Sequence, residues 1–160
     1  TDGVIHAIGH EAAGIEIAKG FLDRISGEKD LSRYVRNMIS LHMRPNMLLS
    51  VECKDKSYNK LFDASVCPED LILLSQADYE GRSGDYIYGD RRERLRARLE
   101  GYKELMSVPY VMGRDLIAAG LVPDRNFSQI LSHAHKLRLS GVSREAAIKE
   151  CIAYSKSIKK

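Results

Sequence analysis

Apolar residues recur along most of the chain at spacings of three and four, the period of a helix with one buried face. A first stripe covers residues 11–25, and Gly27 predicts its end. A second stripe follows Asp30, which we expect to cap the helix, and reaches His42 shortly before Pro45. His42 is therefore expected on a buried face, at the end of its helix. The apolar positions expected to be buried in the first stripe are Ala12, Ile15, Ala18, Leu22 and Ile25.

The remainder of the chain continues the helical pattern. Residues 46–66 are less regular and are expected to hold one or two short helices. Pro68, followed by two acidic residues, indicates the first turn of a helix over residues 68–79. Further helices are predicted over residues 90–106, 112–121, 126–139 and 143–157. A short extended piece is expected at residues 3–8 and a polar turn at residues 81–89. No strand-rich region is visible, so the predicted fold class is all-α.

The length and the apolar content indicate one ordinary core and a tail. The chain has 160 residues, of which 44% are hydrophobic and 29% are charged. We expect an N-terminal helical domain over residues 1–106 and a C-terminal helical tail over residues 107–160. The boundary lies where Pro109 follows the long predicted helix. The sequence begins with Thr1 rather than Met, so we expect a fragment of something longer.

Charge, cysteines and hydropathy restrict the class of protein. The net charge of +3 is too small to argue for a nucleic-acid partner by itself. The three cysteines, Cys53, Cys67 and Cys151, form no C-x-x-C pair, which argues against a disulfide framework and a zinc ribbon and favours a reducing compartment. The longest apolar run, residues 71–74, is far too short to span a membrane, and no basic-then-apolar leader is present. We therefore expect a cytoplasmic protein without membrane contact.

Three residues on separate predicted helices carry ligand chemistry. His10 stands at the start of the first helix, His42 ends the second, and Asp78 falls on the face of its helix that carries leucines. Imidazoles and carboxylates are common ligands of divalent cations. Each residue also has a structural explanation: the histidines as core or capping residues, and Asp78 as the ion-pair partner of Arg82. Only together do they predict a partial metal site.

Two further groups of polar residues, one of arginines and one of histidines, are candidates for binding or packing roles. Five arginines crowd the start of the predicted 90–106 helix, and Arg91, Arg94 and Arg98 share one stripe. Guanidinium groups suit phosphate oxygens, so these three are candidate RNA-binding residues, although a solvated face balanced by nearby glutamates is the commoner meaning. His133 and His135 are two residues apart and face different ways, so we expect them to be surface or packing residues.

Several segments resemble one family in the same order. They are residues 9–14 (GHEAAG), the helix end at His42, residues 76–84 (QADYEGRSG), the break at residues 107–109 (SVP), and the block from residue 113 to residue 141. Together they resemble the C-terminal half of bacterial CCA-adding tRNA nucleotidyltransferases of the poly(A) polymerase family that carry an HD domain. The resemblance covers nearly the whole chain, and it implies an HD-domain-like helical fragment followed by a helical tail.

The resemblance also implies an activity and its residues. In that family a nucleotidyltransferase head adds C, C and A to tRNA 3′ ends, and in some members the HD domain is a metal-dependent phosphohydrolase of cyclic phosphates and phosphomonoesters. By position, Asp78 matches the family's last metal-ligand aspartate, while His10 and His42 match additional pocket histidines of some HD proteins. The chain contains no His-Asp dipeptide and no head. A Mg²⁺, Mn²⁺ or Ni²⁺ site would therefore be incomplete, and we expect no complete catalytic site and no hydrolysis by this chain alone.

These observations lead to one expected function and two alternatives. We expect the HD region of a tRNA nucleotidyltransferase, which supports tRNA handling and, when the domain is complete, metal-dependent phosphohydrolysis. Its partners are then tRNA, through the parent enzyme, and nucleotides. One alternative is a truncated stand-alone HD phosphohydrolase that acts on nucleotides. The other is an RNA-binding or interaction module that needs no metal. The sequence does not indicate the oligomeric state.

Overall fold

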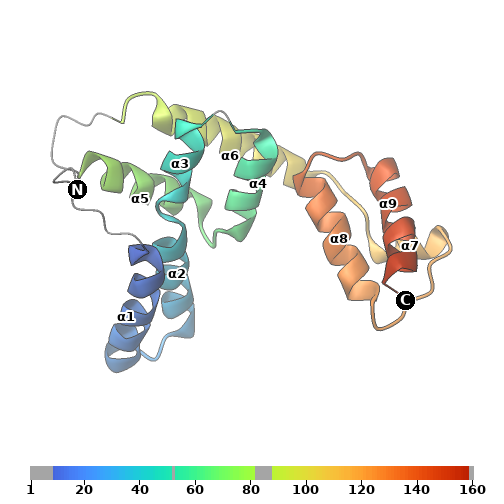
Figure 1. The fold of residues 1–160 in the computed structure, drawn as a ribbon, viewed down its shortest axis with the longest axis horizontal. Helices are drawn as coiled ribbons and strands as arrows, with labels where there is room; N and C mark the ends of the chain where they lie inside the picture. Colours follow the sequence, from blue (N-terminus) through green and yellow to red (C-terminus); the bar gives the residue numbers. More distant parts are fainter. Residues whose placement is uncertain (1–8, 52, 82–87, 159–160) are drawn as a thin grey trace.

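The computed structural model describes residues 9–51, 53–81 and 88–158, and these residues form helices joined by turns and loops, with no strand among them (Figure 1). The all-α prediction is confirmed. The extended piece expected at residues 3–8 and most of the expected turn at 81–89, with Arg82, lie outside the described residues. In chain order the helices are α1 (His10–Ile25), α2 (Lys29–Leu41), α3 (Arg44–Ser50), α4 (Asp55–Ala64), α5 (Pro68–Glu80), α6 (Arg91–Ser107), α7 (Gly113–Ala118), α8 (Phe127–Leu139) and α9 (Arg144–Ser157).

Helix ends follow local chemistry, with two corrections. α2 begins after Glu28, so the expected cap Asp30 lies inside its first turn, where a negative charge suits the helix dipole. α7 is shorter than predicted: it ends at Ala118, and Gly120, with a φ of 90°, follows in the left-handed conformation that favours glycine. The irregular segment between residues 46 and 66 holds most of α3 and all of α4, as expected.

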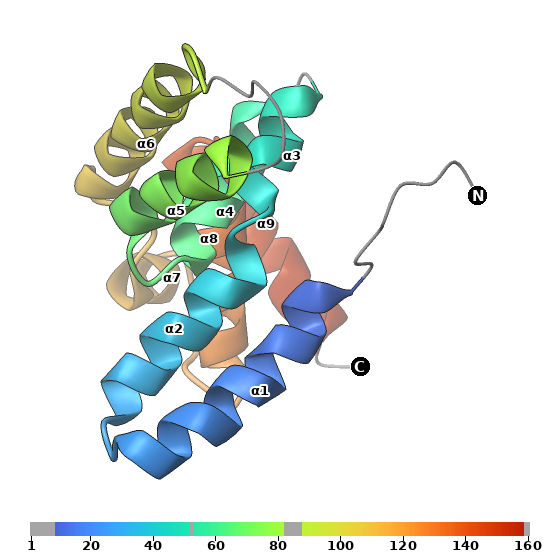
Figure 2. The same cartoon turned by 90° about the vertical axis from the view of Figure 1, so that its left-hand side faces the viewer.

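The first two helices form an antiparallel pair at one end of the molecule (Figure 2). α1 packs chiefly on α2, and of its predicted stripe only Leu22 is buried. Ile25 was expected to be buried but is 63% exposed, and the side chains of Ile17 and Phe21 are 73% and 52% exposed. The reason is geometric: one neighbouring helix covers only part of the apolar face of α1.

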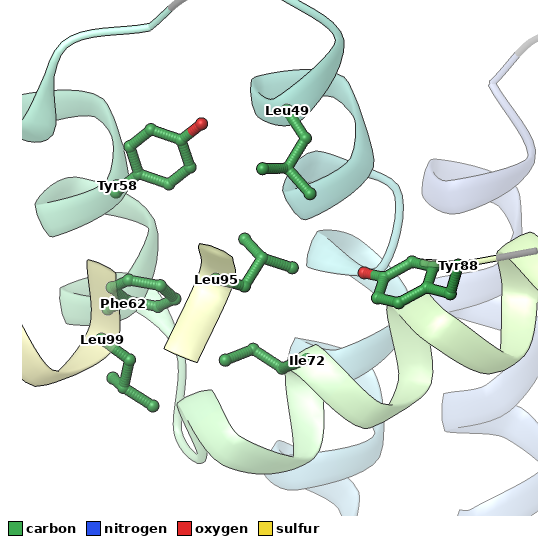
Figure 3. Packing of buried hydrophobic residues seen from close by; sticks show 7 residues of the cluster. All are labelled: Leu49, Tyr58, Phe62, Ile72, Tyr88, Leu95 and Leu99. Carbon is green, nitrogen blue, oxygen red and sulfur yellow. The ribbon is translucent and has the colours of Figure 1, made fainter. Parts of the chain in front are cut away.

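The helices α3 to α6 enclose the first core. Its buried members, shown in Figure 3, are Leu49, Tyr58, Phe62, Ile72, Tyr88, Leu95 and Leu99. Polar groups inside this core form hydrogen bonds, except Asn46 Oδ1, which is buried without a partner among the described residues. The Ser75 and Tyr88 hydroxyl oxygens lie 2.9 Å apart, and Asn46 Nδ2 donates to the Ser75 carbonyl oxygen at 2.8 Å. Met38, Leu61 and Leu71 form a smaller buried cluster that joins α2 to this core.

The C-terminal helices α7 to α9 have a core of their own. It consists of Leu116, Leu121, Ile130, Ala134 and Cys151. Polar contacts join it to the first core, since buried Asn59 Nδ2 donates to the Leu139 carbonyl oxygen at 3.1 Å and Arg138 Nη2 donates to the Leu105 carbonyl oxygen at 2.9 Å. The division at residue 106 stays a prediction, although two separate clusters accord with it. Among the described helices, none is both long enough and apolar enough to span a membrane.

Candidate functional site

The structure brings His10 and His42 together across the α1–α2 pair. Gly9, with a φ of 78°, precedes α1 in the left-handed conformation and places His10 at the first helical position. His42 is the residue after the last turn of α2. Their Nε2 atoms lie 3.2 Å apart, and the rings meet edge to face with centroids 5.2 Å apart. Two of the three predicted ligand residues therefore lie next to each other.

The hydrogen bonds of this pair define what it can hold. His42 Nδ1 lies 2.7 Å from the Ile39 carbonyl oxygen, which only accepts, so Nδ1 donates and the neutral ring keeps its lone pair on Nε2. Two imidazole nitrogens bound to one ion at about 2.0–2.1 Å lie roughly 3.0–3.4 Å apart. The observed spacing fits that requirement, and a backbone carbonyl that orients the ligand ring is a usual feature of metal-binding histidines.

Asp78 does not complete a metal site with the two histidines. Among the described residues, no group of three or more His, Cys, Asp or Glu side chains is arranged to hold a metal ion, so the predicted set of His10, His42 and Asp78 is not assembled. Asp78 lies half-buried on α5, at the edge of the face expected to be inside. Leu74 on that face is itself 38% exposed. Of the three predicted ligands, the structure brings only His10 and His42 into contact among the described residues.

The three candidate RNA-binding arginines differ in their contacts with the rest of the protein. Arg98 forms an ion pair with Asp55 of α4, and its guanidinium carbon lies 5.3 Å from the centre of the Tyr58 ring. The Arg91 guanidinium carbon lies 4.6 Å from the centre of the Tyr79 ring. Arg94 is exposed. The partner of Arg98 is an aspartate on another helix, not a glutamate of its own helix as expected, and RNA contact stays a prediction.

A polar cluster between the two cores was not predicted. His135 Nε2 of α8 lies 2.9 Å from both carboxylate oxygens of Asp63 in α4, and the Tyr102 hydroxyl of α6 donates to Asp63 Oδ1 at 3.2 Å. Burial, followed by the charge and the hydrogen bond of Asp63, raises the pKa of Tyr102 to about 12. Asp63 and His135 are 72 residues apart, so no local spacing could indicate the contact. His133 stacks on Tyr154 with ring centroids 4.2 Å apart, which agrees with the expected packing role.

Comparison of the chain with family models, with curated proteins and with solved structures finds no match. A function can therefore be argued only from the order of the sequence motifs and from how the structure arranges the side chains in them. Of the three residues that the resemblance selects for the pocket, His10 and His42 meet across a separation of 32 residues.

Proposed function

We propose that this chain is the HD-type helical region and helical tail of a bacterial CCA-adding tRNA nucleotidyltransferase. In the parent enzyme it supports tRNA handling, and in a complete HD domain it contributes His10 and His42 to a metal-dependent phosphohydrolase pocket. The observation that carries the proposal is the contact between His10 and His42. The motif order selects these two residues in advance, and the antiparallel packing of α1 on α2 brings the start of α1 next to the end of α2 (Figure 2).

The two histidines have distinct tasks in this proposal. The Ile39 carbonyl holds His42 in the tautomer whose Nε2 accepts, and His10 Nε2, at the start of α1, lies 3.2 Å from that nitrogen. Imidazole ligands suit Ni²⁺ better than Mg²⁺, which prefers oxygen. A divalent ion held there by His10 and His42 would supply positive charge for phosphate oxygens and would activate water for attack. The His-Asp dyad of the family is not in this sequence, so the pair alone provides binding without turnover.

Metal titration tests the site directly. Isothermal titration of the chain with Ni²⁺, Mn²⁺ and Mg²⁺ is expected to show one Ni²⁺ site, with weaker Mn²⁺ and no measurable Mg²⁺ binding. His10→Ala and His42→Ala should each weaken Ni²⁺ binding about tenfold or more, because each removes one of two imidazole ligands. His133→Ala is the matched control, since His133 stacks on Tyr154 far along the chain. Equal Ni²⁺ affinity in the unchanged chain and the three variants would show that the His10–His42 pair is not a metal site.

An activity comparison tests the phosphohydrolase part. The chain and a version extended upstream to include a His-Asp dyad are assayed on a chromogenic phosphomonoester with each of the three metals. The chain should show negligible turnover, whereas the extended domain should show metal-dependent turnover that His42→Ala diminishes. Turnover by the chain at the level of the extended domain would contradict the proposal. A nucleotidyltransferase head encoded upstream would support the tRNA enzyme, and a start codon shortly before the dyad would support a stand-alone phosphohydrolase.

A further inference from the structure

Two hollows border α4. The larger, of about 950 Å³, lies between α4 and α8, and the smaller, of about 340 Å³, lies between α4 and the α2–α3 region. Lys60 of α4 lines both of them, so the two hollows are neighbours at this residue, and together they are called here the α4 groove. In Figure 1, α4 stands between α3 and α8, and the larger hollow is lined from α4 and α8, the smaller one from α4 and the α2–α3 region.

The floor of the α4 groove is apolar. Leu131 and Leu137 of α8 line the larger hollow, and Leu41, Met47 and Leu48 line the smaller one. Met47 is 60% exposed, although it belongs to a helix that otherwise buries its apolar side chains in the core. An exposed methionine beside leucines is typical of surfaces that adapt to a helical partner, since its unbranched side chain has several rotamers of similar energy.

The rim of the same groove is positively charged. Lys60 lines both hollows, Arg44 lines the smaller one and Lys136 lines the larger one, and all three are exposed. Asp63 is the one acidic residue among the described side chains that line either hollow, and its carboxylate is already engaged by His135 and Tyr102. The groove therefore offers three cations that face solvent and no uncompensated acid.

We propose that the α4 groove docks an amphipathic helix of a partner protein, with an apolar face for the floor and Asp or Glu residues along its flanks for the rim. Such recognition uses apolar anchors at positions i, i+3, i+4 and i+7, and the complementary charges fix orientation and speed up association. Nucleic acid fits less well, because its charged backbone gains from cations but not from a floor of leucines. The inference concerns a different surface from the His10–His42 pair and does not depend on it.

Designed peptides test the groove. A fluorescent helical peptide with leucine anchors and glutamate flanks is compared with the same peptide carrying lysine flanks, by anisotropy on the intact chain. The acidic peptide should bind at least about tenfold more tightly, and added salt should reduce the difference. The double variant Lys60→Glu with Lys136→Glu should weaken the acidic peptide about tenfold and strengthen the basic one. Lys149→Glu on α9 is the control, because that lysine is exposed and does not line the groove.

Other outcomes would overturn the inference. Equal affinity for both peptides, or no binding of either, would leave the groove without a role in helix docking. Binding of a short RNA duplex that depends on Lys60 and Lys136 and displaces the acidic peptide would make the groove a nucleic-acid site instead. Met47→Asp provides a second variant: Met47 is exposed, so the fold should survive, yet a charge on the floor should abolish peptide binding. Circular dichroism confirms that each variant is folded.

Discussion

His42 donates its Nδ1 proton to the Ile39 carbonyl oxygen, so the lone pair of Nε2 faces His10 across 3.2 Å. The contact with the Ile39 carbonyl therefore determines that Nε2, not Nδ1, is the nitrogen of His42 that accepts a bond. The Asp63 carboxylate behaves similarly, because its oxygens accept from His135 and Tyr102 and are withdrawn from other partners. In both cases a neighbouring hydrogen-bond partner determines which atom of the side chain can accept a further bond.

Asp63→Asn should lower the pKa of Tyr102 from about 12, because the carboxylate charge that disfavours tyrosinate is gone, whereas burial, the larger cause, keeps that pKa above its ordinary value. Absorbance titration of tyrosinate measures the shift, with Tyr102→Phe to assign the step. The folded pKa exceeds the unfolded one of about 10, so the stability that Tyr102 contributes is complete below pH 10 and is lost as pH rises through 12. An unchanged titration in Asp63→Asn would contradict the assignment.

Leu95→Ala should lower the free energy of unfolding by about 2–5 kcal/mol, because this side chain is fully buried among the α3–α6 helices and its removal leaves a cavity. Leu73→Ala on α5 is the matched control, since Leu73 is 47% exposed and its truncation should cost well under half as much. Urea unfolding followed by circular dichroism measures both. Similar losses in the two variants would argue against the described core.

Single helices in this fold depend on neighbours to different degrees. α1 has one main packing partner and leaves Ile17 and Phe21 exposed, whereas α4 contacts α3, α6 and α8. α7 is too short to be stable alone and is held by its ends. Asp115 accepts from the Met112 backbone N–H at 2.8 Å and pairs with Arg144 of α9 at 2.8 Å.

Asp115→Asn should lower the melting temperature and make it less sensitive to acid. The Met112 N–H and then Arg144 hold the pKa of Asp115 below its ordinary value. A lowered folded pKa means that the stabilisation is present above the unfolded pKa, about 3.9, and disappears as pH falls through the folded one. Thermal melts at pH 7 and pH 3 measure the effect, with Glu104→Gln as an exposed control. A variant that loses as much stability between these pH values as the parent would refute this role.

In the described residues, polar contacts join the hydrophobic core of α3 to α6 to the core of the C-terminal helices. Asn59, Arg138 and the Asp63–His135 pair connect them, and the α4 groove runs alongside this connection. Because the joining surface is mostly polar, the C-terminal helices are expected to open more readily than the central ones.

Asn59→Ala should cost about 1–3 kcal/mol, because the Leu139 carbonyl loses a buried donor. The loss should appear mainly in α7 to α9, which we expect to exchange amide hydrogens faster than α4 and α5. Hydrogen exchange by mass spectrometry resolves the two regions, and Asn126→Ala, near the start of α8, serves as control. Uniform acceleration over the whole chain would indicate one cooperative unit rather than two joined cores.

Helix positions and the all-α class followed from the sequence alone, because apolar period, prolines and glycines act over a few residues. Even so, the pattern misjudged Ile25, since periodicity says which face is apolar but not whether a neighbour covers it. His10 and His42 were expected to approach each other because both were placed on core-facing positions of neighbouring helices, and they do so across the α1–α2 pair. The sequence also marked Asp78, which the described fold does not bring into a metal site with them.

Tertiary structure alone decided which polar groups became partners. Asp63 and His135 lie 72 residues apart, and Arg98 and Asp55 lie 43 apart, so neither contact has a local signature. The α4 groove likewise exists only because α8 returns to the side of α4. Contacts of this kind depend on how helices dock, which is set by the sum of many small packing terms over the whole core. The sequence of a helix determines its apolar periodicity, but which helix packs against it depends on the tertiary structure of the whole chain.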